Sequence, residues 1–116
     1  MDGNRLARLK TVQLTTRGRR SGRPRTVTVW FVASGERRIA VQHASRRPAH
    51  WYWNLAGEPA VTLDFGDGPL TARAAPIEDP ARVREVLAQV REKYWAAWLI
   101  QLLGRGAPRV AAEITW

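Results

Sequence analysis

Five arginines lie within nine residues in the segment 17–25, which reads RGRRSGRPR. The planar guanidinium group matches phosphate and carboxylate oxygens with paired hydrogen bonds. Gly18 and Gly22 allow backbone conformations that bring N–H groups close to a ligand, and Ser21 adds a hydroxyl donor. The segment is therefore predicted to bind a phosphorylated, polyanionic ligand. The alternative is a solvated turn whose arginines only keep the surface soluble.

This segment differs from the two common phosphate-binding motifs. It lacks the GxxxxGK(S/T) spacing of a P-loop. No helix of a βαβ unit follows it, as a dinucleotide fingerprint would require. Any phosphate site here must therefore be built differently.

A second candidate is the aromatic segment His50-Trp51-Tyr52-Trp53-Asn54. Aromatic faces stack on planar heterocycles, and His50 and Asn54 carry groups that hydrogen-bond a carbonyl or a ring nitrogen. The alternative for any single ring is that it plugs the end of a barrel. That alternative accounts less well for three neighbouring rings than for one.

Three residues are candidates for a direct catalytic role: His43, Ser45 and Tyr94. No G-x-S-x-G motif accompanies His43 and Ser45, and no acidic residue is placed to orient the imidazole, so a hydrolase is not expected. Tyr94 could supply a proton, although its helical spacing with Val90 is more typical of a core or dimer contact. The two histidines and the scattered carboxylates have no recognised metal-ligand spacing, so no metal site is predicted.

The composition limits the classes of protein to consider. The chain has 116 residues, enough for one core, and its net charge of +9 favours an anionic partner. It contains no cysteine, which excludes disulfides and thiolate metal sites. It also lacks a secretory signal and the apolar run of roughly 20 residues that a membrane span needs. We therefore expect a cytoplasmic protein without a membrane span, with one cofactor-binding domain over residues 1–116.

Short strands separated by turn residues dominate the chain. Alternating and β-branched runs predict five or six strands, and the pair Asp67-Gly68 predicts a hairpin between two of them. The expected strands are residues 11–16, 26–32, 37–43, 60–65, 70–77 and, as a last closing strand, 109–115.

Two helical segments accompany these strands. Residues 48–55 indicate a short helix or turn across a barrel end. Asp79 and Pro80 fit the N-cap and first position of a longer helix, in which apolar residues recur at helical spacing as far as Tyr94. The pattern could continue through Trp95 and beyond. Many strands with one late helix predict a barrel or sandwich with a helix packed against it.

The order of these motifs resembles a known family. The string TTRGRRSGRPR, the apolar strand after it, the PAHWYWNL segment and Gly57-Glu58-Pro59 resemble the deazaflavin-dependent nitroreductases. Those enzymes are split β-barrel flavin and deazaflavin oxidoreductases, related to pyridoxamine phosphate oxidase-like proteins. The likeness covers about residues 11–75. It implies a mainly β (α+β) fold: a six-stranded antiparallel split β-barrel with a short crossing helix and one long helix in the C-terminal half.

The resemblance also implies a cofactor and an activity. The cofactor would be coenzyme F420, an 8-hydroxy-5-deazaflavin with a phospholactyl and oligoglutamate tail, whose several carboxylates use a basic groove more fully than the phosphate of FMN. The activity would be F420-dependent reduction of a quinone, a nitroaromatic compound or an activated enone, in a homodimer. The cofactor-binding residues expected from the resemblance are Arg17, Gly18, Arg19, Arg20, Ser21, Gly22, Arg25, Trp51 and Asn54.

Departures from the family pattern leave alternatives open. Thr28 stands where many relatives have proline, and the short stretch 43–47 replaces a longer Gly-rich loop, which leaves the choice of substrate open. An FMN-binding split-barrel protein and a protein that only carries the cofactor are two alternatives. A third is a basic nucleic-acid-binding module, which is not favoured because it needs a continuous stripe of positive charge with exposed aromatic rings.

Overall fold

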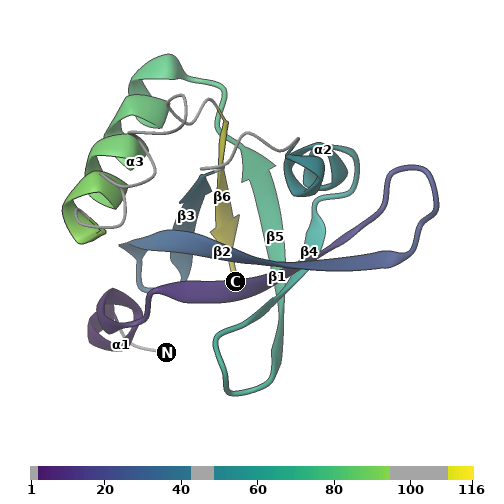
Figure 1. Cartoon of the computed structure of the whole chain (residues 1–116), viewed down its shortest axis with the longest axis horizontal. Coiled ribbons are helices and arrows are strands. Elements are labelled where there is room, and N and C mark those ends of the chain that lie inside the picture. Colours follow the sequence, from purple (N-terminus) through teal and green to yellow (C-terminus); the bar gives the residue numbers. More distant parts are fainter. Residues whose placement is uncertain (1–2, 43–48, 95–109) are drawn as a thin grey trace.

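Six antiparallel strands form a closed barrel (Figure 1). The computed structural model describes residues 3–42, 49–94 and 110–116. The strands are β1 (Thr11–Arg17), β2 (Pro24–Gly35), β3 (Arg38–Gln42), β4 (Ala60–Asp64), β5 (Pro69–Pro76) and β6 (Ala111–Thr115). The predicted mainly β (α+β) fold is confirmed, and the strand boundaries differ from the predicted ones by no more than three residues.

The strand order is β1-β2-β3-β6-β5-β4, and pairing of β4 with β1 closes the barrel. The pairs β1–β2, β2–β3 and β4–β5 join strands that are consecutive in sequence. β6, the last strand, is inserted between β3 and β5, so the two halves of the chain are joined through it.

Alternation along each strand builds the barrel interior. In β1, Val12 and Leu14 point inward and are buried, whereas their neighbours on the strand are exposed or partly exposed. Inward residues of the other strands surround Phe31, whose ring packs edge-on against Phe65 with 5.4 Å between the ring centres. Burial of these apolar side chains is the main favourable term for folding.

Two of the helices match the predicted segments. α2 (His50–Gly57) lies across one end of the barrel and contacts β1 and β5. α3 (Pro80–Lys93) packs on the outside against β2 and β3, where a second, smaller apolar cluster forms. Asp79 caps α3 by accepting a hydrogen bond from the amide of Ala81 at 3.0 Å, as its position before Pro80 predicts. No described helix is both long and apolar enough to cross a membrane.

The first helix, α1 (Gly3–Arg8), was not predicted from the sequence. It spans only six residues, which is too short for a helical repeat to be visible. It contacts β2, and the side chain of its residue Leu6 is fully buried. A tertiary contact therefore stabilises this helix, rather than a strong local preference.

The end of α3 is fastened to β2 at the point where β2 changes partners. β2 pairs with β1 as far as Trp30 and with β3 from Phe31 onward. There the Tyr94 hydroxyl donates to the carbonyl of Phe31 at 2.6 Å, and the same oxygen is the acceptor for the Phe31 amide at 3.3 Å. Lys93 Nζ also donates to the Phe31 carbonyl, at 3.1 Å. These bonds satisfy backbone groups that β1 no longer reaches.

Lys93 makes the stability of the protein depend on pH. Desolvation lowers the pKa of its half-buried ammonium group from 10.5 to about 8. Between these two pH values the unfolded chain binds more protons at Lys93 than the folded chain, so the free energy of unfolding should rise with pH over this window. Burial raises the pKa of Tyr94 to about 12, and this opposes the trend above its ordinary value of 10.

We therefore expect Lys93→Met to remove the rise in stability between pH 8 and 10. Urea denaturation at a series of pH values measures it, and Lys10→Met is the matched control. An equal slope in the wild type and in Lys93→Met would contradict the assignment to Lys93.

Candidate functional site

A cleft of about 670 Å³ lies between the β1–β2 hairpin and α2. The hairpin projects from the barrel on the same side as α2 (Figure 1). Side chains from two segments far apart in sequence therefore face one space. The residues lining the cleft are Thr16, Gly18, Arg19, Arg20, Ser21, Arg25, Thr26, Val27, His50, Trp51 and Asn54.

Backbone hydrogen bonds fold the tip of the hairpin into a tight turn. The Gly18 amide donates to the carbonyl of Arg23 at 2.8 Å, and the Gly22 amide donates to the carbonyl of Gly18 at 2.8 Å. Ser21 Oγ accepts from the Arg23 amide at 3.2 Å. Gly22 has φ +70°, in the left-handed region that side chains other than glycine rarely adopt.

The two glycines should respond differently to substitution. A Cβ added at Gly22 meets no atom within 4 Å. Gly22→Ala should therefore lower the free energy of unfolding only through backbone strain, by about 1–2 kcal/mol. Gly22→Asn should cost less, because asparagine tolerates the left-handed region. Gly18→Ala would place its Cβ 2.8 Å from Ser21 Oγ and must displace that side chain.

Chemical denaturation of the three variants tests this expectation. Gly22→Asn should recover part of the stability that Gly22→Ala loses. A larger loss for Gly22→Asn than for Gly22→Ala would show that space, and not backbone conformation, is limiting at this position.

Asn54 connects the hairpin to α2 and to the barrel. It is buried, with 4% of its surface exposed. Its Oδ1 accepts from both the backbone amide of Arg19, at 3.2 Å, and Arg19 Nη1, at 3.0 Å. Its Nδ2 donates to Thr16 Oγ1 at 3.2 Å, and Thr16 is also buried. The carboxamide thus holds Arg19 in place from a helix that lies 35 residues further along the chain.

Not all the predicted cofactor-binding residues face the cleft. Gly18, Arg19, Arg20, Ser21, Arg25, Trp51 and Asn54 line it. Arg17 and Gly22 are not among its lining residues. Arg17 Nη1 donates to the Gly22 carbonyl at 3.1 Å within the hairpin, so we expect these two residues to shape the turn.

Some lining residues were not in the predicted cofactor-binding set, although the sequence had already indicated His50 as part of the aromatic segment. Thr16, Thr26, Val27 and His50 also border the cleft. Strand alternation could have indicated Thr16, which points to the same side as Leu14, at the end of β1. His50 is the first residue of α2, and its exposed side chain lies at the rim of the cleft.

Of the three candidates for catalysis, only Tyr94 belongs to the described part of the chain. His43 and Ser45 lie outside the described residues. Tyr94 is buried, does not line the cleft, and uses its hydroxyl to bond the backbone of Phe31. Its ring stacks on Trp30 with 4.8 Å between ring centres. This environment indicates the core role that the helical spacing suggested as an alternative.

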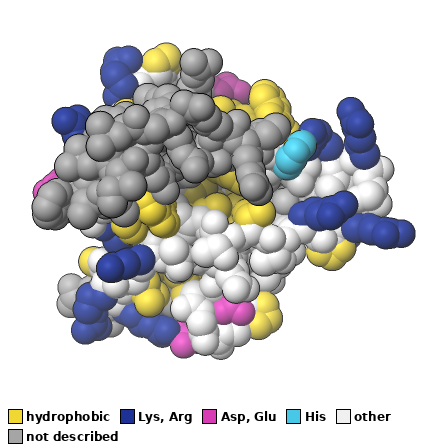
Figure 2. Space-filling model, viewed as in Figure 1, with side chains coloured by type: hydrophobic (Ala, Val, Ile, Leu, Met, Phe, Trp, Pro, Cys, Tyr) yellow, Lys and Arg dark blue, Asp and Glu magenta, His cyan; other side chains and the backbone are white. Residues whose placement is uncertain are grey.

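The described residues that line the cleft carry charge of one sign. Arg19, Arg20 and Arg25 are among them, and no Asp or Glu of the described residues lines the cleft. Figure 2 shows Lys and Arg side chains gathered around the projecting hairpin, without acidic side chains beside them on this face. Trp51 and Val27 add apolar surface. The donors therefore fit a ligand that combines a phosphate and carboxylates with a flat apolar body.

These features define the class of protein: a split β-barrel whose basic, aromatic-bordered cleft suits an anionic cofactor. The chain belongs to the F420H(2)-dependent quinone reductase family, whose model matches residues 1–99. It is accordingly an oxidoreductase, and its cofactor is coenzyme F420. The resemblance inferred from the ordered motifs is thus confirmed. The family match does not support the alternative cofactor, FMN.

Solved structures share the fold. An F420-H2 dependent reductase, FDR-A, has 24% sequence identity and a TM-score of 0.63, over 92% of this chain and 94% of that one. A protein described as a domain-swapped dimer has 23% identity and a TM-score of 0.63, over 92% and 80% of the two chains. HutZ, the heme storage protein from Vibrio cholerae, has 20% identity and a TM-score of 0.64, over 99% and 90%. No curated protein matches the sequence.

Proposed function

We propose that the protein reduces a small organic acceptor, and that the cleft between the β1–β2 hairpin and α2 holds the tail of F420. The acceptor would be a quinone, with nitroaromatic compounds and activated enones as further candidates. The observation that carries the proposal is that Arg19, Arg20 and Arg25 line one cleft together with Trp51, and that no carboxylate lines it in the described ranges of the chain. When bound, reduced F420 supplies the hydride for the reduction.

The hairpin residues would hold the anionic groups of the cofactor. Arg20 and Arg25 present guanidinium groups with enough donors for a phosphate and for tail carboxylates. Ser21 adds a hydroxyl, and the backbone at Gly18 is free of a side chain that would crowd the ligand. Since these groups are exposed, salt should weaken the attraction.

The α2 residues would border the part of the cofactor nearest the barrel. Trp51 has only 6% of its surface exposed, so its ring is fixed in orientation and excludes water from one side of the cleft. Asn54 would act indirectly, because its carboxamide already bonds Arg19 and Thr16. The proposed direct contacts are therefore Gly18, Arg19, Arg20, Ser21, Arg25 and Trp51, while Arg17, Gly22 and Asn54 position them.

A steady-state assay tests the proposal. Purified protein is mixed with reduced F420 and a panel of a naphthoquinone, a nitroaromatic compound and an enone, and oxidation of F420 is followed by its absorbance. We expect turnover with the quinone above the uncatalysed rate. F420 binding without turnover of any acceptor would instead support a carrier, and absence of F420 binding at low salt would overturn the proposed site.

The exposed aromatic surface offers little support for a nucleic-acid-binding module. Within the described ranges Trp53 is the single exposed large hydrophobic residue, with 54% of its surface exposed. A stacking platform for single strands would need several such rings in a row. We propose instead that the chain reduces a small organic acceptor. We also propose that it does so in the cytoplasm, as one domain of residues 1–116.

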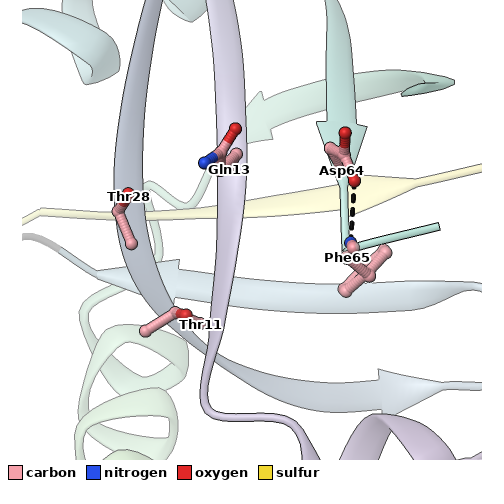
Figure 3. A pocket seen from close by; sticks show the side chains of 6 residues that line it. Thr11, Gln13, Thr28, Asp64 and Phe65 are labelled. Atoms are coloured by element: carbon pink, nitrogen blue, oxygen red, sulfur yellow. Dashed lines mark hydrogen bonds between the residues drawn. The ribbon is translucent and has the colours of Figure 1, made fainter. Parts of the chain in front are cut away.

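We also propose a homodimer, formed through a polar face on the outside of β1, β2 and β4. A pocket of about 330 Å³ on this face is lined by Thr11, Gln13, Thr28 and Asp64, among others. In Figure 3 Gln13 lies between Thr28 on one side and Asp64 on the other. Asp64 Oδ1 there accepts from the Gly66 amide at 2.7 Å. Gln13 pairs directly with Thr28 on one side and with Asp64 on the other. The described residues that line this pocket include no Lys or Arg, so on a chain of net charge +9 this face lets two copies approach with less repulsion.

Light scattering coupled to size-exclusion chromatography tests the dimer. The wild type should elute with the mass of two chains, and Gln13→Arg should shift it to one. A monomeric wild type would refute the dimer, and a dimeric Gln13→Arg would place the interface elsewhere.

A further inference from the structure

A second pocket lies at the end of the barrel opposite the Arg-rich hairpin. It has a volume of about 310 Å³ and is formed by α1, the β2–β3 turn, the β4–β5 turn and the residue after β6. β1 begins at this end and runs to the hairpin at the other, so the pocket and the cofactor cleft are separated by the length of a strand. The pocket is lined by Arg5, Arg37, Phe65, Asp67, Gly68, Pro69, Leu70 and Trp116.

One wall of this pocket is apolar and fixed in place. Phe65 packs against Phe31 in the barrel core and against Trp116, with 5.5 Å between the centres of the latter pair of rings. The Trp116 amide donates to the carbonyl of Arg37 at 3.0 Å, which continues the pairing of β3 with β6. Leu70 adds aliphatic surface to the lining. A flat apolar group would find a preformed aromatic surface here.

The charges of the pocket favour an anion. Arg5 and Arg37 line it together with one acidic side chain among the described residues, Asp67. Asp67 forms an ion pair with Arg5, and the hydrogen bond from Arg5 lowers the pKa of this carboxyl. Both partners are substantially exposed, so another carboxylate can compete for Arg5. In the described part of the chain Arg37 forms no ion pair.

We infer that this pocket binds a small aromatic monocarboxylate, with its ring on Phe65 and Trp116 and its carboxylate on Arg37 and Arg5. The volume is near the lower end of the range for ligand pockets, which suits a ligand of one or two rings and excludes the whole cofactor. The inference is independent of the proposed function, because the two sites share no lining residue.

Paired probes test this site in the full chain. Indole-3-acetate and its uncharged amide have the same ring and nearly the same shape, and titration calorimetry with saturation-transfer NMR measures the binding of each. We expect the acid to bind about tenfold more tightly than the amide, because charge-assisted hydrogen bonds are the stronger ones. Arg37→Gln should remove most of this difference, and Trp116→Leu should weaken both probes alike.

Arg25→Gln, in the cofactor cleft, is the matched control for the location. It should leave the binding of indole-3-acetate unchanged, and each variant should keep the wild-type melting temperature within a few degrees. Equal affinity for the acid and the amide would overturn the inference. So would a loss of binding in Arg25→Gln but not in Arg37→Gln, or no binding of the acid at millimolar concentration.

Discussion

Replacement of both Arg20 and Arg25 by glutamine is expected to weaken F420 binding roughly 100-fold, since each charge-assisted hydrogen bond contributes about 1.5 kcal/mol or more. Both side chains line the cleft between the hairpin and α2. Both are exposed, so their loss should leave the free energy of unfolding nearly unchanged. Fluorescence titration with F420 measures the affinity, and the dependence of binding on salt should become weaker in the variant.

Arg23→Gln is the matched control for this pair. Arg23 belongs to the same hairpin and carries the same charge, but it does not line the cleft. Within the described residues, Arg23 forms hydrogen bonds through its backbone: its amide donates to Ser21 Oγ, and its carbonyl accepts from the Gly18 amide. The substitution keeps both bonds. If Arg23→Gln weakened binding as much as the double variant, total charge would be responsible and the proposed contacts would be refuted.

Asn54→Leu is expected to lower both the stability of the protein and its affinity for the cofactor tail. Loss of the carboxamide leaves the buried Thr16 hydroxyl and the Arg19 amide without their partner, at a cost of about 2–3 kcal/mol. Arg19 would no longer be held at the cleft, so F420 affinity should fall at least about tenfold. Affinity for the deazaflavin riboside should not change, because that compound lacks the phosphate and carboxylates that Arg19 is proposed to contact.

Asn54→Asp separates the two effects. A carboxylate at this position keeps the acceptor for Arg19 but loses the donor to Thr16, and it adds a negative charge beside the cleft. Stability should therefore fall less than in Asn54→Leu, while F420 affinity falls as much or more. Tyr52→Phe, on the same helix, is the control for substitutions in α2. Equal losses for F420 and for the riboside in Asn54→Leu would indicate general damage to α2 rather than a positioning role.

Much of the fold could be predicted because its signals are local. Strand alternation depends only on the two-residue period of a β-strand, and Val12 and Leu14 follow it. The N-cap of α3 needs only Asp79 and the residues directly after it. α1 escaped prediction because its stability depends on the burial of Leu6 against the rest of the chain.

The sequence by itself determined where the cationic groups are, since charge and glycine positions are properties of residue type, and it determined which motifs occur in which order. Only the tertiary structure decided which of those groups share a cleft. Arg17 and Arg20 are the same residue type in the same segment. Yet the Arg17 side chain donates a hydrogen bond to the Gly22 carbonyl within the turn, whereas Arg20 lines the cleft. Asn54, predicted to contact the cofactor, lines the cleft and also bonds Arg19 across 35 residues of sequence. The physical reason is that packing between segments distant in sequence sets where each side chain points and which groups it bonds. No local sequence pattern specifies that packing.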